Sequence, residues 1–183
     1  MAKNQRINAV GVDKAISNFQ DYLYSRVKID GVAVADWESY DRVYKTPYKG
    51  GLIPEFFTGG VDYKEVFYND NFSLTSFFVA DDDVDTDEGD AIQDVSLIVQ
   101  ANIDTLYPNI AHRADEELRN LFMSLSQSYY NADVFAFDSV EMGIDNVYRE
   151  FVKNDIRLED MSKKHVFRLN FTVKYTPKCC TDC

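Results

Sequence analysis

The stretch His165-Val166-Phe167-Arg168-Leu169-Asn170-Phe171-Thr172-Val173-Lys174-Tyr175 decides the fold class more than any other part of the sequence. Residues of one phase, from His165 to Tyr175, are mostly apolar, and those of the other phase are mostly polar and basic. A period of two is typical of a β-strand with one face against a core. The sequence therefore predicts a strand over His165–Tyr175 whose outer face carries Arg168 and Lys174.

Two further strands are predicted upstream, over Leu74–Ala80 and Val95–Asn102. The second alternates apolar and polar residues, and Ile98 is the exception to the alternation. The segment between them, residues 81–94, is an acidic loop. Because the two strands flank this loop directly, we expect a long-looped antiparallel hairpin.

Two amphipathic helices are predicted, over Val12–Ser25 and Arg113–Tyr130, because apolar residues recur at spacings of three and four. A strand over Val134–Val140 and a short helix follow the second. Strands that form a hairpin and then alternate with helices indicate an α+β fold with a mainly antiparallel sheet, flanked by the two principal helices. We expect a single domain over residues 1–176 and a flexible tail over 177–183.

The segment 28–72 has weak periodicity and is cut by glycine and proline into short pieces. We expect a long irregular, aromatic-rich insertion there, with a loop around Thr46–Gly60 and one or two short strands near Lys64–Tyr68. One interpretation is an irregular layer over the core. The other is an arm on a neighbouring subunit, because aromatic residues are enriched in interface cores.

Charge is distributed unevenly along the 183 residues, whose formal net charge is −12. Residues 81–94 hold eight acids and no base, whereas the other 169 residues hold 23 acids and 19 bases. Residues 161–183 carry a net charge of +4. Strong overall acidity argues against tight binding to phosphate backbones. We expect neither a secretory signal nor a membrane span, because no apolar run is long enough.

Metal sites and catalytic motifs are weakly supported. Asp83, Asp85 and Asp87 have the spacing of calcium-loop ligands, with Asp94 at the twelfth position, but Glu88 stands where the sharp turn needs glycine. The tail holds Cys179, Cys180 and Cys183 without a second cluster to complete a zinc site. His112 and His165 stand alone, and no phosphate-binding or nucleophile motif is present. We therefore expect no metal, no cofactor and no enzymatic activity.

The remaining candidates are surfaces for subunit contacts or for a channel. The basic face of the final strand could contact nucleic acid or the acidic loop of a neighbouring subunit. A head-to-tail contact of unlike surfaces closes into a ring when its rotation permits. The candidate residues are Asp81, Asp82, Asp83, Asp85, Asp87, Glu88, Arg168, Lys174, Trp37, Tyr44, Tyr48, Phe56 and Phe57.

The order of these elements resembles the tail-terminator, or neck, proteins of tailed bacteriophages. The resemblance lies in the strand pair Ser73–Ala80 and Val95–Asn102 with its acidic connection, the helix Arg113–Tyr130 and the final strand His165–Tyr175. It covers most of residues 10–176 as a pattern, without a short diagnostic motif. The composition, rich in Asp and Tyr, is also similar to that of structural proteins of crAss-like phages.

The resemblance implies a virion structural protein, assembled in the host cytoplasm as a homo-oligomeric ring of hexameric or twelve-fold symmetry. Such a head–tail connector ring lies between portal and tail proteins, and double-stranded DNA passes through it without specific binding. The acidic loop would then face the channel or reach an adjacent ring. The alternative is a small acidic protein-binding module, either a DNA-mimicking inhibitor or an assembly chaperone.

Overall fold

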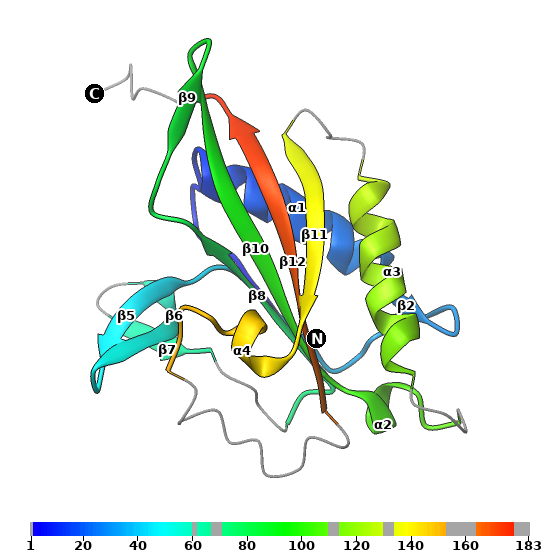
Figure 1. Cartoon of the computed structure of the whole chain (residues 1–183). Helices are drawn as coiled ribbons and strands as arrows, with labels where there is room; N and C mark the ends of the chain where they lie inside the picture. The colour runs from blue at the N-terminus through cyan, green and yellow to red at the C-terminus, as the bar shows by residue number, and fades with distance from the viewer. Residues whose placement is uncertain are drawn as a thin grey trace.

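A computed structural model of the chain describes residues 2–59, 62–66, 71–109, 114–129, 134–152 and 164–177. Within these residues, the main sheet has seven strands in the order β1-β4-β8-β10-β12-β11, with β9 beside β10 (Figure 1). The elements are β1 (Ala2–Asn4), α1 (Val12–Arg26), β2 (Lys28–Ile29), β3 (Val32–Ala33), β4 (Trp37–Arg42), β5 (Tyr44–Tyr48), β6 (Gly51–Gly59), β7 (Asp62–Glu65), β8 (Leu74–Ala80), β9 (Asp85–Asp87), β10 (Asp90–Asn102), α2 (Ile103–Leu106), α3 (Asp115–Gln127), β11 (Phe135–Met142), α4 (Ile144–Val147) and β12 (Lys164–Tyr175).

The predicted α+β fold with a mainly antiparallel sheet is confirmed. Strand β10 pairs antiparallel with β8 on one side and with β12 on the other, and β11 pairs antiparallel with β12. Only β1–β4 and β4–β8 are parallel within the described part of the sheet. The predicted strand Leu74–Ala80 has the observed bounds, but β10 begins at Asp90, five residues before the predicted start.

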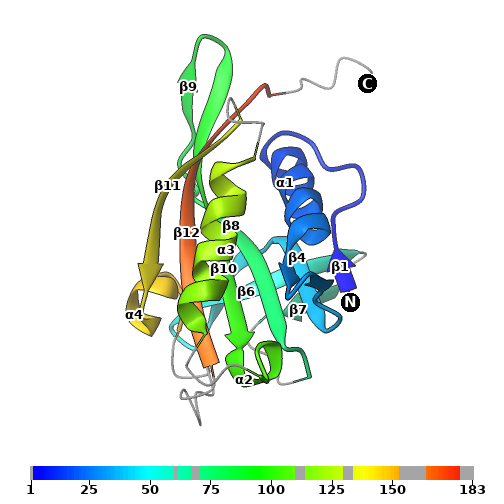
Figure 2. The same cartoon turned by 90° about the vertical axis from the view of Figure 1, so that its right-hand side faces the viewer.

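The two predicted helices cover one face of the main sheet (Figure 2). Val12, Ile16, Phe19 and Leu23 of α1 are buried as the spacing predicts. On α3, Leu118 and Phe122 are buried, whereas Leu121 is only half-buried. Together with Phe167, Leu169 and Phe171 of β12, these residues form the larger hydrophobic core. The expected helix limits Arg113 and Tyr130 lie outside the described residues.

The opposite face of the sheet is also buried, which the sequence did not predict. Ile98, the exception to the alternation in β10, joins Phe77 and Val79 of β8 in a second core. Tyr148 beside α4 and Phe56 of β6 cover them. Because the sheet has apolar residues on both faces, β8 is buried along its whole length. The exception at Ile98 was therefore the signal of a two-sided sheet.

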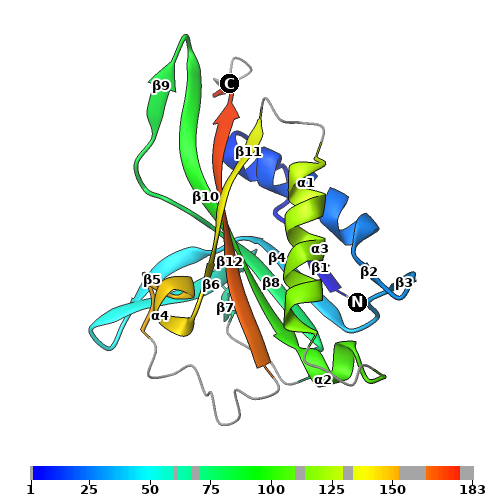
Figure 3. The ribbon, with the colours of Figure 1, turned by 45° about the vertical axis from the view of Figure 1, so that its right-hand side comes forward.

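The expected irregular insertion over residues 28–72 is wrong in its central part. The expected loop around Thr46–Gly60 is largely strand, because β5, β6 and β7 form an antiparallel three-stranded sheet. This small sheet lies against the face of the main sheet opposite α1 and α3 (Figure 3). Residues 60, 61 and 67–70 of the segment lie outside the described residues.

Candidate functional site: the acidic hairpin and its surroundings

Residues 81–94, here called the acidic hairpin, project beyond the body of the molecule as an extension of the main sheet (Figures 1 to 3). Asp87 of β9 pairs with Asp90 of β10, so the turn consists of Glu88 and Gly89. Both have positive φ, 51° and 93°, as a type I′ turn requires. The segment predicted as a long acidic loop therefore itself forms a hairpin with a tight turn. Its second strand is the start of β10, which continues into both hydrophobic cores.

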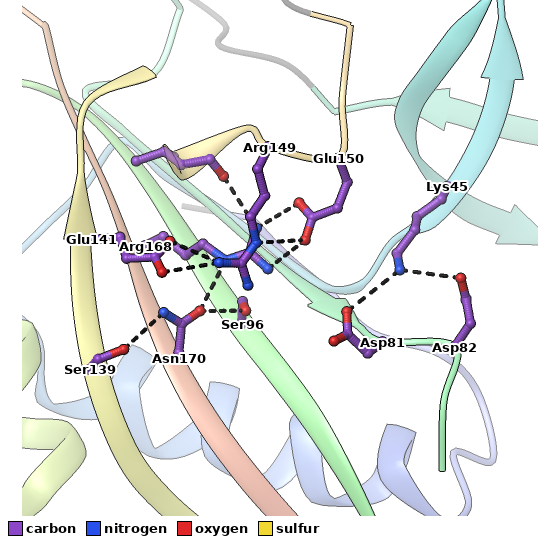
Figure 4. A network of polar contacts seen from close by, with 11 residues as sticks. Lys45, Asp81, Asp82, Ser96, Ser139, Glu141, Arg149, Glu150, Arg168 and Asn170 are labelled. Atoms are coloured by element: carbon purple, nitrogen blue, oxygen red, sulfur yellow. Dashed lines mark hydrogen bonds and ion pairs between the residues drawn. The ribbon is translucent and has the colours of Figure 1, made fainter. Parts of the chain in front are cut away.

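Two lysines of the same chain neutralise part of the acidic hairpin. Lys174 of β12 lies 3.1 Å from Asp87 and 3.7 Å from Asp90, and the hydrogen bond to Asp87 raises the pKa of Lys174. Lys45 of β5 lies 3.3 Å from Asp82 and 3.7 Å from Asp81 (Figure 4). One of the two interpretations of the basic face was a contact with the acidic loop of a neighbouring subunit, and Lys174 forms this contact within its own chain.

Three carboxylates along the hairpin, from its base to its turn, keep their negative charge. No cation of the described residues lies within ion-pair distance of Asp83, Asp85 or Glu88. All three residues are exposed, and Val84 between them is 47% exposed. Carboxylates in this arrangement repel one another and any polyanion that approaches the hairpin.

Arg168 does not lie on an exposed basic face, contrary to expectation. It is 1% exposed, and its guanidinium donates to both carboxylate oxygens of Glu150 at 2.6 and 2.7 Å (Figure 4). It also donates to Asn170, which bonds to Ser96 and Ser139. Burial raises the pKa of Glu150, but the hydrogen bonds and charge of Arg168 outweigh burial and lower it overall. Arg168 is thus a buried ion-pair partner between β12 and the segment after α4.

The five predicted aromatic candidates separate into buried and exposed residues. Trp37 is 1% exposed and donates its indole N–H to Ser76 at 3.0 Å, and Phe56 is 5% exposed in the second core. Both pack inside the chain itself, which removes them and Arg168 from the surface candidates. Tyr44, Tyr48 and Phe57 remain at least partly exposed on the small sheet.

Tyr63, which the sequence interpretation left out, completes this exposed aromatic face. Its ring centroid lies 5.9 Å from that of Tyr44 and 5.2 Å from that of Phe57, and the residue is half exposed. The pairing of Phe57 with Tyr63 in β6 and β7 brings these rings together. The position of Tyr63 in an aromatic-rich segment was the available signal, but the strand register needed to place it was not predicted.

A charged cluster beside this face was not predicted at all. Asp13 of α1 accepts hydrogen bonds from Arg6 at 2.7 Å and from Arg42 at 2.6 Å. Both guanidinium groups lie over the ring of Tyr44, at 4.5 and 5.5 Å from its centroid. Asp41 has no exposed surface, and its burial raises its pKa to about 6 despite the opposing hydrogen bond and charge of Arg6. These residues are far apart in sequence, and nothing in their spacing indicates the cluster.

The candidate metal ligands and the histidines could form a site only where their side chains lie close together. Among the described residues, no group of three or more His, Cys, Asp or Glu side chains is placed to hold a metal ion, so Asp83, Asp85 and Asp87 do not converge. His165 is buried, with Nδ1 3.6 Å from a carboxylate oxygen of Asp115. His112 and the cysteine tail lie outside the described residues.

Comparison with known proteins does not assign the chain to a family. No model of a known protein family matches the sequence, and a search of curated proteins finds no match. In the described part of the chain, no helix is both long enough and apolar enough to span a membrane.

Proposed function

We propose that the chain is a virion structural protein of a tailed bacteriophage, which assembles as an oligomeric ring in the neck or tail. The ring would join portal to tail and surround the DNA channel. The observation that carries the proposal is the acidic hairpin, whose strand β10 runs without interruption from the two cores to the turn at Glu88 and Gly89. The charge of the hairpin is therefore held at a fixed position by the sheet.

A fixed, partly neutralised acidic projection suits a surface that DNA must pass without sticking. Lys45 neutralises part of the charge at the base of the hairpin and Lys174 part of the charge beside its turn, whereas Asp83, Asp85 and Glu88 keep their negative charge. Binding of a protein to duplex DNA depends largely on Lys and Arg side chains, which neutralise phosphates and release the counterions bound to them. A lumen lined with carboxylates lacks that attraction and repels the phosphates instead.

The exposed aromatic face supplies a second surface that an oligomer would use. Tyr44, Tyr48 and Tyr63 are 38%, 39% and 50% exposed on the small sheet. Tyrosine is enriched in the buried centres of protein interfaces, where its ring packs and its hydroxyl finds a partner. We assign this face to the contact with a neighbouring subunit or with the portal or tail protein.

Electron microscopy of the purified full chain, with and without the acidic charges, tests the proposal. We expect rings with a lumen for the wild type and for the triple variant Asp82→Asn, Asp83→Asn, Asp85→Asn. The wild-type rings should not retain duplex DNA in a gel-shift titration, whereas the triple variant should bind it at least tenfold more tightly. The matched control is Asp36→Asn, Asp62→Asn, Asp104→Asn, which removes three exposed carboxylates elsewhere.

The outcomes separate the two candidate functions. If the wild type forms no rings at any concentration, the ring proposal is contradicted. This outcome would favour the alternative, a small acidic protein-binding module in which the same hairpin mimics DNA. In that case the hairpin triple variant, and not the control, would lose binding to a DNA-binding protein.

A further inference from the structure

The segment before α1, residues 2–10, here called the β1 strap, crosses the edge of the main sheet. Its residues 2–4 pair in parallel with Glu38, Ser39 and Tyr40 of β4. No residue of the strap belongs to either hydrophobic core. Ile7 and Val10, two of its apolar residues, are 91% and 61% exposed. The strap is therefore attached without the burial that holds the strands β4, β8, β10 and β12 of the same sheet.

Polar contacts fix the strap in place. The backbone N–H of Arg6 donates to Asp41 at 2.7 Å, and its guanidinium donates to Asp13 at 2.7 Å and to the carbonyl of Arg42 at 2.8 Å. Lys3 forms an ion pair with Asp21 of α1, and Gln5 donates to Asp21 at 2.8 Å. These contacts recognise the residues of the strap specifically, although the strap adds nothing to the core.

The connection from the strap to α1 has the features of a hinge. Asn8 and Gly11 both have positive φ, 58° and 56°. A hollow of about 390 Å³ lies between the strap and the small sheet and is lined by Ile7, Val10 and Phe57, although Arg6 still contacts the ring of Tyr44. Opening of the strap loses few apolar contacts, but it breaks the contacts of Arg6 with Asp13 and Asp41, which must then be made with another strap.

Release of the strap alone would uncover β4, whose residues Trp37–Asp41 are buried. The backbone N–H and C=O groups along that edge of β4 would then lack partners, and such an edge tends to pair with a strand of another chain. The other sheet edges are less receptive, because β11 has a register shift between Phe137 and Ser139 and β9 carries two aspartates. The strand that complements this edge is β1, which pairs with β4 and whose neighbour Arg6 bonds to Asp41 and Arg42.

We propose that the β1 strap is exchanged between copies of this chain, so that residues 2–6 of one copy pair with β4 of its neighbour in the assembled protein. The occupant of the β4 edge is then a second copy, recognised by the same ion pairs and hydrogen bonds as in one chain. Exchange of an identical element is an inexpensive route to assembly. Ile7 and Val10 lie in the connection that would cross between the copies. The inference rests on the proposed function only in that copies of the chain assemble.

Isotope-resolved cross-linking of the wild-type chain tests the exchange. Equal amounts of ¹⁴N and ¹⁵N protein are unfolded, mixed, refolded together and treated with a carbodiimide, which joins paired lysines and carboxylates directly. Lys3 and Asp21 are paired and 32% and 52% exposed, so the reagent reaches them. We expect about half of the Lys3–Asp21 cross-links to join a ¹⁴N peptide to a ¹⁵N peptide.

The internal control is Lys174–Asp87, a pair 3.1 Å apart within the sheet of one chain, which should give same-isotope links only. Same-isotope links alone at Lys3–Asp21 would overturn the exchange, even where rings form. Mixed links in a particle that is not a ring would support the exchange and contradict the proposed function. The two proposals therefore fail by different observations.

Discussion

The carboxylate of Glu150 receives two hydrogen bonds from the guanidinium of Arg168, at 2.6 and 2.7 Å, on the face of the main sheet opposite α1 and α3. Arg168 is one of the largest fully buried side chains of the described residues. The pair links β12 to the segment that follows α4, whose residues Tyr148 and Phe151 cover the second core. A charge in such a position is tolerated because its partner is in place.

Removal of Glu150 should be strongly destabilising. Glu150→Ala leaves the buried guanidinium without its counter-ion, and we expect the free energy of unfolding to fall by about 3–5 kcal/mol. The double variant Glu150→Leu, Arg168→Met should recover most of that loss, because neither charge then remains buried. Urea unfolding followed by circular dichroism measures both. Arg149→Ala is the control, since Arg149 is half exposed and its ion pairs should contribute less than about 1 kcal/mol. A cost for Glu150→Ala as small as that of the control would contradict this account.

Asp41 should make the stability fall as the pH rises. Its pKa in the folded protein is about 6, above the ordinary value of 3.8, so the folded state holds the proton more tightly than the unfolded chain. The stability that protonation confers is therefore lost as the pH rises through 6. The charged groups that act on Asp41 are Arg6, Asp13 and Arg42.

The measurement compares wild type with Asp41→Asn, whose amide does not titrate. Between pH 5 and pH 7.5, the free energy of unfolding of the wild type should fall by about 1–1.5 kcal/mol relative to the variant. Asp104→Asn, at an exposed carboxylate of α2, is the matched control. A wild type that gains stability relative to Asp41→Asn over this range would show that the carboxylate is stabilised in its charged form.

Two leucines of α3 test the assignment of the larger core. Leu118 has no exposed surface, whereas Leu121 is half-buried at the margin. Leu118→Ala should lower the free energy of unfolding by about 2–5 kcal/mol, as is typical of buried leucines, and Leu121→Ala by roughly 1 kcal/mol. The chemical change is identical, so each variant controls for the other. Equal costs would mean that α3 is rotated from its position here.

The elements with a strict period were predictable from the sequence, and those defined by distant partners were not. The alternation in His165–Tyr175 and the stripe Val12, Ile16, Phe19 and Leu23 each follow from one buried face, and both are confirmed. The three-stranded sheet β5-β6-β7 was missed because Pro47 and Pro54 lie inside its strands, where proline usually indicates a break.

The same reason explains the errors at the candidate site. Arg168 alternates in phase with Asn170 and Thr172, and this phase predicts an exposed face as long as the sheet is buried on one side only. The burial of Arg168 depends on α4 and on Glu150, 18 residues away, which no local pattern indicates. The cluster of Arg6, Asp13 and Asp41 likewise depends on the packing of β1, α1 and β4.

Native mass spectrometry of the full wild-type chain, under reducing conditions and over a range of protein concentrations, tests the central claim most directly. A ring closes at a fixed number of subunits, so the account predicts one dominant oligomer of six or more copies whose size does not grow with concentration. A monomer at every concentration, or a ladder of oligomers that lengthens without a limit, would contradict it.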